Sequence, residues 1–362
     1  MKTIARIKDI AERAGVSTGT VDRVIHNRGR VDPDVQKRVQ RILGEMRYEP
    51  NLIARALGSK RDQRIAVIIP NPVIDPYWLG PKEGIEKAGA AVTQYGINIQ
   101  LYIFNPDDAE TFVEQARKAT DTRPDGSLLS PIFSRDTTPF FKEWEYKNIP
   151  FVLFNTQIPD SGALSYVGQD SYQSGLLAGK LAHYGQPQPC GILILHIDEE
   201  VSNATHLAKK EQGFRDYFKQ NGLNDYKIVS AELNRPEQAG FSDLLSSLIK
   251  HTPNLRSIYV TTSKSHVIAA CIEQKTIPPV KLMGYDLLPK NVDQLNKGMI
   301  SFLINQNPKG QGYWGIHQLV NHLVFKKEIP ALKYLPLDVV TKENAVYYTS
   351  DELIYDDYKL VV

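Results

Sequence analysis

Three side chains have the chemistry to bind a polyhydroxylated ring. Tyr77 and Trp78 are adjacent aromatic residues, and their flat faces can stack on the apolar side of a sugar ring. Asp286 follows a short apolar run, and its carboxylate can accept two hydroxyl protons from a sugar diol. Two plainer interpretations stay open: a hinge or cap role for Asp286, and ordinary packing for the aromatic pair.

The common catalytic and nucleotide-binding motifs are missing from the sequence. It contains no Gly-x-Gly-x-x-Gly after the first expected strand, no Walker-type loop, no His-Glu-x-x-His and no Gly-x-Ser-x-Gly. His317 and His322 are five residues apart, not the four of a helical ligand pair, so we interpret them as ordinary helix residues. We therefore expect no metal, no cofactor and no enzyme activity.

Strands alternating with helices must position these side chains. Apolar runs predict buried, parallel-type strands at residues 65–69, 97–104, 127–130, 151–154, 192–197, 257–261 and 281–284. Helical segments lie between them, for example at 80–95, 172–184 and 204–220. This alternation predicts an α/β fold with a doubly wound parallel sheet, whose ligand sites lie at the carboxyl ends of the strands. Nearly 300 residues exceed one such sheet, so we expect two lobes with a cleft between them.

Composition excludes several classes of protein. With 42% hydrophobic and 23% charged residues, the 362-residue chain is neither disordered, nor collagen-like, nor a coiled coil. Its two cysteines are too few for a disulfide framework and suit a reducing compartment. No apolar run is long enough to span a bilayer, and the first residues lack an apolar signal region. We expect a cytoplasmic protein with no membrane association.

The net charge of +2 conceals a split along the chain. Residues 1–64 hold 15 Lys and Arg against 8 Asp and Glu, a balance of +7. The remainder holds 28 against 33, a balance of −5. This asymmetry favours a basic nucleic-acid-binding module on an acidic body, although a merely solvated basic surface is the alternative.

The basic segment has the pattern of three short helices. Gly15 can adopt the left-handed conformation that ends a first helix, and Ser17 is a good cap for a second. Asp32 and Pro33 mark the start of a third helix, with Asp as the cap and Pro at the first helical position. Two helices joined by a tight turn form a helix-turn-helix, whose second helix reads base edges in the major groove.

This segment resembles the headpiece and hinge of the lactose-repressor family of bacterial transcription regulators. The resemblance is carried without gaps by residues 7–17, Thr20-Val21, Arg23-Val24, residues 47–51 and residues 54–57. It implies DNA contacts in the headpiece from Ser17, Thr18, Gly19, Thr20, Arg23 and Asn27, and in the hinge from Asn51, Ala54 and Leu57. Arg is suited to bidentate contact with guanine, and Leu57 matches a leucine that wedges between base pairs in the minor groove. A plain linker is the alternative for the hinge.

The rest of the chain resembles the ribose-binding branch of the type I periplasmic binding-protein fold. Short motifs in the same order carry this resemblance: residues 70–72, 75–78, 124–126, 149–152, 168–170, 212–214, 284–286 and 306–308. It implies ligand contacts from Asn71, Tyr77, Trp78, Ser130, Asn155, Asp170, Lys210, Ser263, Asp286 and Gln306. Lys210 stands where this branch has Arg, and Lys does not reproduce a planar bidentate donor, so we expect an effector other than ribose.

These observations predict a sequence-specific repressor, a homodimer on a pseudo-palindromic operator, controlled by a small sugar-like effector. We expect a helix-turn-helix domain at residues 1–49, a hinge and linker at 50–63, and a two-lobed effector-binding and dimerisation domain at 64–362. One alternative is a cytoplasmic sugar-binding or sugar-modifying protein on the same fold, with Asp286 and Lys210 as an acid and base pair. A solute receptor without a DNA role is another, and it would need an export signal.

Overall fold

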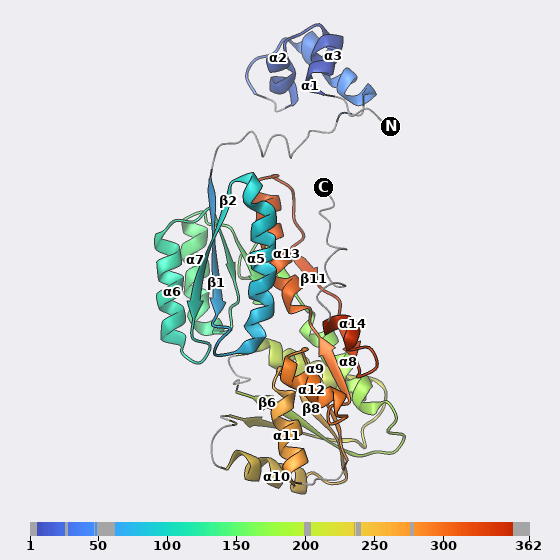
Figure 1. Ribbon diagram of the computed structural model, residues 1–362. Helices are drawn as coiled ribbons and strands as arrows, with labels where there is room; N and C mark the ends of the chain where they lie inside the picture. The colour runs from blue at the N-terminus through green and yellow to red at the C-terminus, as the bar shows by residue number, and fades with distance from the viewer. Residues whose placement is uncertain are drawn as a thin grey trace. The chain divides into compact units, whose positions relative to one another are not determined.

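The structure is a computed structural model that describes residues 6–25, 28–46, 48, 62–198, 204–234, 236, 240–275 and 279–349. Contacts along the chain separate two units, Met1–Ser59 and Lys60–Val362 (Figure 1). Each unit has its own buried core.

Three helices form the described part of the first unit: α1 (Ile7–Ala14), α2 (Thr18–Ile25) and α3 (Pro33–Glu45). Gly15 ends α1 with a φ of 62°, which is why glycine suits this turn. Asp32 caps α3 by accepting the backbone N–H groups of Asp34 and Val35. A shared core of small and branched side chains buries Ile10, Val21, Val39 and Ile42 completely or nearly so. The expected helix starts and stops are therefore confirmed.

The second unit contains two six-stranded sheets, each forming the centre of one lobe. In the first lobe the strand order is β11-β5-β4-β3-β1-β2. Its strands are β1 (Gln63–Pro70), β2 (Ile97–Phe104), β3 (Gly126–Leu129), β4 (Phe151–Phe154), β5 (Ser165–Gly168) and β11 (Leu332–Tyr334). Its helices are α5 (Leu79–Val92), α6 (Ala109–Asp121), α7 (Ser134–Tyr146) and α13 (Pro308–Leu323), with 3-10 turns at Pro76–Trp78 and Thr93–Tyr95. Helices α6 and α7 cover one face of this sheet, and α5 and α13 cover the other (Figure 1).

The second lobe repeats this plan, with the strand order β12-β10-β9-β8-β6-β7. Its strands are β6 (Gly191–Ile197), β7 (Lys227–Leu233), β8 (Leu255–Val260), β9 (Lys281–Tyr285), β10 (Phe302–Asn305) and β12 (Asp338–Val340). Its helices are α8 (Ser171–His183), α9 (Thr205–Gln220), α10 (Phe241–His251), α11 (Ser265–Lys275), α12 (Pro289–Asn296) and α14 (Val346–Thr349).

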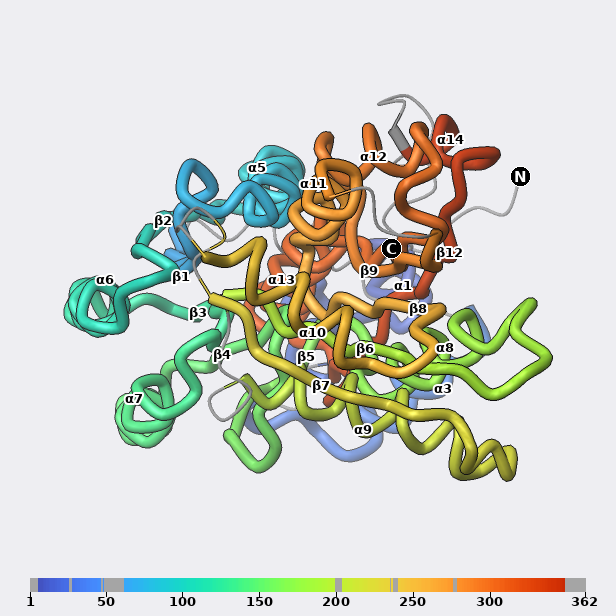
Figure 2. The backbone as a smooth tube through the Cα atoms, turned by 90° about the horizontal axis from the view of Figure 1, so that it is seen from below, coloured from blue at the N-terminus to red at the C-terminus, as the bar shows by residue number. Residues whose placement is uncertain are grey.

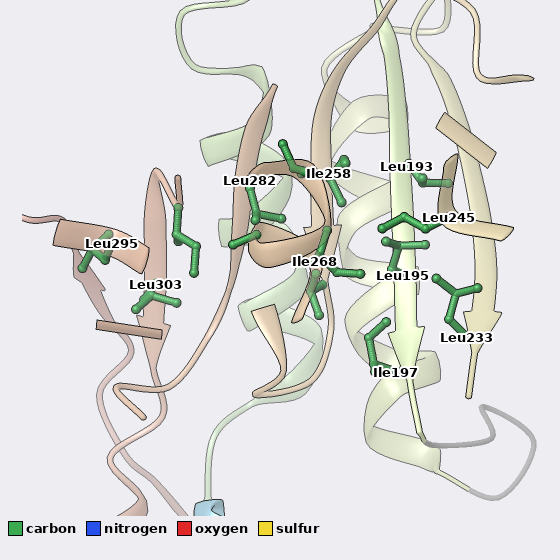
Figure 3. Close-up of a cluster of buried hydrophobic side chains, with 14 of the residues drawn as sticks. Leu193, Leu195, Ile197, Leu233, Leu245, Ile258, Ile268, Leu282, Leu295 and Leu303 are labelled. Atoms are coloured by element: carbon green, nitrogen blue, oxygen red, sulfur yellow. The ribbon is translucent and has the colours of Figure 1, made fainter. Parts of the chain in front are cut away.

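Burial on both faces explains why the strands read as continuous apolar runs. Along β6, Ile192 and Ile194 pack with Phe214 of α9, whereas Leu193 and Leu195 face the opposite layer. Figure 3 shows that second core, in which strand residues meet side chains of α10, α11 and α12. A strand covered on both sides favours apolar residues on both faces, so the alternation of apolar and polar residues is lost.

The chain passes between the lobes along β5 to α8, β10 to α13, and β11 to β12. Helix α13 thereby returns to the first lobe and packs beside α5, far from it in sequence (Figure 2). The seven expected strands are confirmed, with ends that differ by at most two residues. The structure adds β5, β7, β10, β11 and β12, and β12 pairs antiparallel with β10. These strands are three or four residues long or, for β7, partly exposed, so their apolar signal is weak.

Candidate functional site

The start of α2 presents most of the residues expected to contact DNA. Ser17 Oγ accepts the backbone N–H of Thr20 at 3.1 Å and lies 3.0 Å from its hydroxyl. Thr18, Gly19 and Arg23 are exposed on the same helix. An exposed helix start with small polar residues and one arginine can enter a major groove. Asn27, Asn51, Ala54 and Leu57 lie outside the described residues and stay predictions.

In the second unit, left-handed residues directly follow several parallel strands. Asn155 after β4, Asp198 after β6 and Asp286 after β9 have φ values of 65°, 57° and 64°. Asn and Asp tolerate this conformation better than other side-chain-bearing residues. Each strand therefore ends in a sharp turn with a polar side chain at its carboxyl end, where doubly wound sheets place their ligands.

Asp286 is the centre of a buried polar cluster. Its Oδ2 accepts hydrogen bonds from Ser263 Oγ at 2.8 Å and from Gln306 Nε2 at 2.6 Å. Only 1% of the residue is exposed. Burial raises the pKa of this carboxyl to about 6, against the opposing effects of Lys210 and of the two hydrogen bonds. The turn is held by Asn291, whose Nδ2 donates to the backbone oxygens of Ser263 and Asp286.

The first lobe contributes Tyr77 and Asn155 to the surroundings of Asp286. Asn155 Nδ2 donates to the Tyr77 phenolic oxygen at 2.7 Å. Burial raises the pKa of Tyr77 well above its usual value, and the charge of Asp286 in the second lobe raises it further. We name Tyr77, Asn155, Lys210, Ser263, Asp286 and Gln306 the interlobe cluster.

Lys210 places a cation in this cluster. Its Nζ donates to the backbone oxygen of Thr261 at 2.9 Å and lies 3.7 Å from the centre of the Tyr285 ring. Only 2% of the residue is exposed, and this carbonyl and this ring help to stabilise the buried ammonium. Its charge also lowers the pKa of Asp286.

Glycines bring the backbone of α9 close to α8 and so set the position of Lys210. A Cβ atom on Gly175 of α8 would lie 2.0 Å from the Lys210 carbonyl oxygen. A Cβ on Gly213 of α9 would lie 2.1 Å from the carbonyl oxygen of Tyr172. The first lobe repeats this close approach between α5 and α13, where Gly84 and Gly312 face backbone oxygens at similar distances. The glycines of the sequence motifs therefore have a packing reason.

Four other expected ligand residues have structural partners or lie in packed surroundings. Asn71 Oδ1 accepts the N–H of Val73 within its own turn. Asp170 caps α8 through the N–H groups of Tyr172 and Gln173. Trp78 packs edge-on against Tyr77 and Phe154, and Ser130 is fully buried. Their roles as ligand contacts stay predictions.

The structure also brings in residues that the sequence did not single out for the site. Gln169 Nε2 donates to Gln306 Oε1, and Gln311 Nε2 donates to the Gln306 backbone oxygen at 3.0 Å. Gln169 stands beside Asp170 in a family motif, which was a usable signal. Gln311 lies one turn into α13, and only its helix position could have indicated it.

Two further features concern the part of the chain that the structure describes. None of its helices combines the length and apolar character that crossing a bilayer requires. Within the same residues, no three His, Cys, Asp or Glu side chains are grouped as a metal site would need.

Comparison with known proteins identifies both parts of this architecture. Residues 6–51 match the bacterial regulatory proteins of the lacI family, and residues 65–327 match a periplasmic binding protein domain. The sucrose operon repressor of Escherichia coli is 30% identical over 257 residues, covering 68% of this chain and 71% of the repressor. The chain belongs to the lacI family. It is a DNA-binding regulator of transcription.

Two other comparisons extend over more of this lacI-family regulator. The transcriptional regulator MalR of Streptococcus pneumoniae is 29% identical over 340 residues, covering 89% of this chain and 99% of MalR. A crystal structure of a LacI transcriptional regulator from Bacteroides fragilis has a TM-score of 0.72 and 29% identity, and covers 80% of this chain and all of that one. The α/β fold with N-terminal helices is therefore confirmed.

Proposed function

We propose that the regulator is a repressor that binds its operator as a homodimer and is released by a small sugar-like effector. The interlobe cluster carries the proposal, because a buried carboxylate, an ammonium, two amides and two hydroxyls converge from both lobes. Such a set of donors and acceptors suits a neutral polyhydroxylated ligand. The names of relatives, which include sucrose and ribose operon repressors, support the same ligand class.

The coupling follows from the position of the cluster. Tyr77 and Asn155 belong to one lobe, Lys210 and Asp286 to the other, and Gln306 lies on a connection between them. A ligand held by both lobes stabilises one relative arrangement of the lobes. Linkage then requires that operator and effector change each other's affinity by the same factor. We propose that this rearrangement alters how the hinge segments of the two subunits pair on DNA.

The proposed domain boundaries are 1–49 for the DNA-binding domain, 50–63 for the hinge and 64–362 for the effector and dimerisation domain. The two family matches and the division of contacts near residue 60 support this organisation. Two copies would read the halves of a pseudo-palindromic operator through Ser17, Thr18, Gly19, Thr20 and Arg23 of each α2. We propose no catalytic role.

An electrophoretic shift assay tests the proposal. The full chain is mixed with DNA fragments from upstream regions, and sucrose, maltose, D-ribose, D-glucose and D-galactose are then added separately. We expect one fragment to shift as a dimer complex and one sugar to release it. A chain that shifts no fragment at low salt is not an operator-binding repressor, and a specific complex that no small carbohydrate alters contradicts the effector class.

A further inference from the structure

We propose that His196, Glu211 and Arg215 are positioning residues for effector binding, which hold α9 so that Lys210 stays beside Asp286. None of the three belongs to the interlobe cluster. This inference rests on the proposed function of that cluster as the effector site. Its structural part, the dependence of Lys210 on the three residues, can be tested without any ligand.

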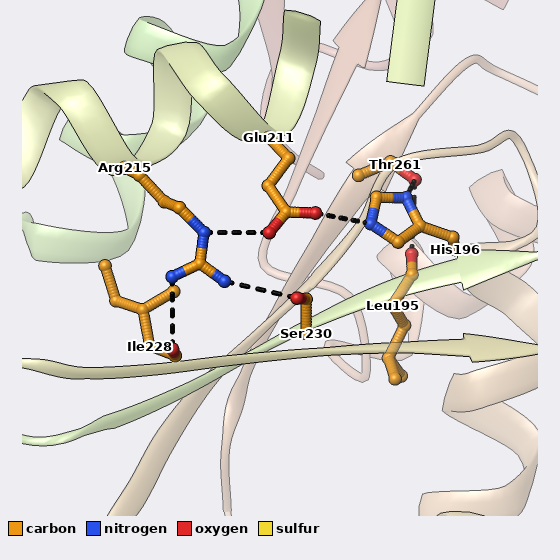
Figure 4. A network of polar contacts seen from close by, with 7 residues as sticks. All are labelled: Leu195, His196, Glu211, Arg215, Ile228, Ser230 and Thr261. Carbon is orange, nitrogen blue, oxygen red and sulfur yellow. Dashed lines mark hydrogen bonds and ion pairs between the residues drawn. The ribbon is translucent and has the colours of Figure 1, made fainter. Parts of the chain in front are cut away.

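Both carboxylate oxygens of Glu211 form hydrogen bonds (Figure 4). One carboxylate oxygen lies 2.8 Å from His196 Nε2, on β6, and the other accepts from Arg215 Nε at 2.8 Å. Arg215 in turn donates to the backbone oxygen of Ile228 and to Ser230 Oγ, both on the edge strand β7. The array thus ties one helix to two neighbouring strands and opposes its rotation over the sheet.

Thr261 connects this array to Lys210. Its hydroxyl lies 2.8 Å from His196 Nδ1, and its backbone oxygen accepts the Lys210 ammonium at 2.9 Å. Its backbone N–H donates to Leu195 of β6. Thr261, at the end of β8, is therefore hydrogen-bonded both to His196 and to Lys210. A displacement of His196 would move Thr261 and, with it, the acceptor of the Lys210 ammonium.

A rotation of α9 would move Lys210 away from Thr261. The Lys210 carbonyl oxygen packs closely against Gly175, and its Nζ lies 3.7 Å from the centre of the Tyr285 ring. Lys210 and Glu211 are adjacent in sequence, so a rotation that moves one moves the other. By opposing that rotation, the bonds of Glu211 keep the ammonium at Thr261.

The pKa of Glu211 agrees with a carboxylate that keeps these hydrogen bonds at neutral pH. The hydrogen bond from His196 is the main cause that lowers the pKa of Glu211 to about 2, and Arg215 adds to it. The carboxylate therefore stays ionised at neutral pH. The Arg215 side chain is 39% exposed, and an ion pair this close to solvent adds little to stability, so a geometric role accounts for these bonds better than stability alone.

Crystal structures of the full-length Glu211→Ala and Glu211→Gln variants give the first test. We expect Lys210 Nζ to leave the Thr261 backbone oxygen in the alanine variant and to remain near it in the glutamine variant, which can still bond His196. Thr120→Val is the matched control, because it removes a buried hydrogen bond to Trp144 in the other lobe. An unchanged Lys210 in Glu211→Ala overturns the inference.

A double-mutant cycle gives the second test. It uses isothermal titration with whichever of sucrose, maltose, D-ribose, D-glucose and D-galactose the wild-type protein binds. We expect Glu211→Ala to weaken binding about tenfold, and to have little further effect in a Lys210→Met background. Equal effects in both backgrounds would mean that Glu211 does not act through Lys210. If the wild-type protein binds none of the five sugars, the proposed effector class fails, while the crystal structures still decide the inference.

Discussion

Gln306 Nε2 donates to Asp286 Oδ2 over 2.6 Å, joining a connection between the lobes to the buried carboxylate of the interlobe cluster. Gln306 also accepts a hydrogen bond from Gln169, which lies on another connection. Two of the three connections between the lobes therefore reach Asp286 through amide side chains. A ligand that bonds to this carboxylate therefore acts on a group that is linked to two of the segments joining the lobes.

Replacing Asp286 by Asn tests its role as a ligand acceptor. We expect Asp286→Asn to reduce the response to the effector at least tenfold, because an amide offers one acceptor oxygen where the carboxylate offers two. Operator affinity should be nearly unchanged, since the headpiece is a separate unit. The measurement is the sugar concentration that releases half of the bound operator. A normal response would exclude Asp286 as a ligand contact.

The same carboxyl predicts a pH dependence. Because burial raises the pKa of Asp286 to about 6 from 3.8, effector affinity should fall as pH drops below 6 and the carboxyl gains a proton. Calorimetric titrations between pH 5 and 8 would measure this, with Asp286→Asn as the variant that lacks the transition. An affinity independent of pH throughout this range would contradict binding to the ionised form.

The free energy of unfolding should change with pH in the opposite direction to effector affinity. The folded state holds the proton more tightly than the unfolded chain, so the free energy of unfolding falls as pH rises from 3.8 through about 6. Above pH 7 the buried charge costs about 3 kcal/mol by the size of this shift. Asp286→Asn should therefore be more stable than wild type at pH 8, as measured by urea unfolding. If wild type and Asp286→Asn are equally stable at pH 8 as well as at pH 5, the pKa of Asp286 is not raised in the folded protein.

Arg23→Lys separates base reading from phosphate attraction. Lysine keeps the charge but loses the bidentate geometry, so specific operator affinity should fall by about 1–3 kcal/mol while non-specific affinity stays constant. Competition between operator and random DNA measures both. Lys37→Arg is a control at an exposed position of α3. If neither affinity changes, the charge alone matters, and Arg23 contacts the phosphate backbone and not a base.

Leu57→Ala tests the hinge at a residue that lies outside the described ones. An apolar wedge acts only on bent, specific DNA, so the substitution should weaken operator binding far more than non-specific binding. Circular-permutation shift assays would show less bending of the operator. Unchanged bending together with unchanged operator affinity would favour a plain linker.

Gly175→Ala tests the close contact between α8 and α9. The added Cβ would lie 2.0 Å from the Lys210 carbonyl oxygen, so the helices must separate. We expect a loss of about 1–3 kcal/mol in unfolding free energy and a weaker effector response. Gly44→Ala in α3 is the control, because its Cβ meets nothing within 4 Å and alanine favours a helix. If both variants are equally stable, α8 and α9 can separate at Gly175 without a loss of stability.

The sequence alone was sufficient wherever structure depends on neighbouring residues. The turn at Gly15, the caps at Ser17 and Asp32, and the fully buried strands follow from local conformational preference and from runs of apolar residues. Asp286 was also predictable as a polar residue at the carboxyl end of a parallel strand, the edge at which such sheets bind ligands, and its contact with a ligand stays a prediction.

Only the tertiary structure decided which distant side chains meet. Gln169 and Gln306 are 137 residues apart, and no periodicity in the chain predicts that their amides bond. The same holds for His196 and Thr261, and for the backbone contacts that require Gly175 and Gly213. Such contacts arise when sheets and helices pack in three dimensions, and their geometry is set by the whole lobe and not by the local sequence.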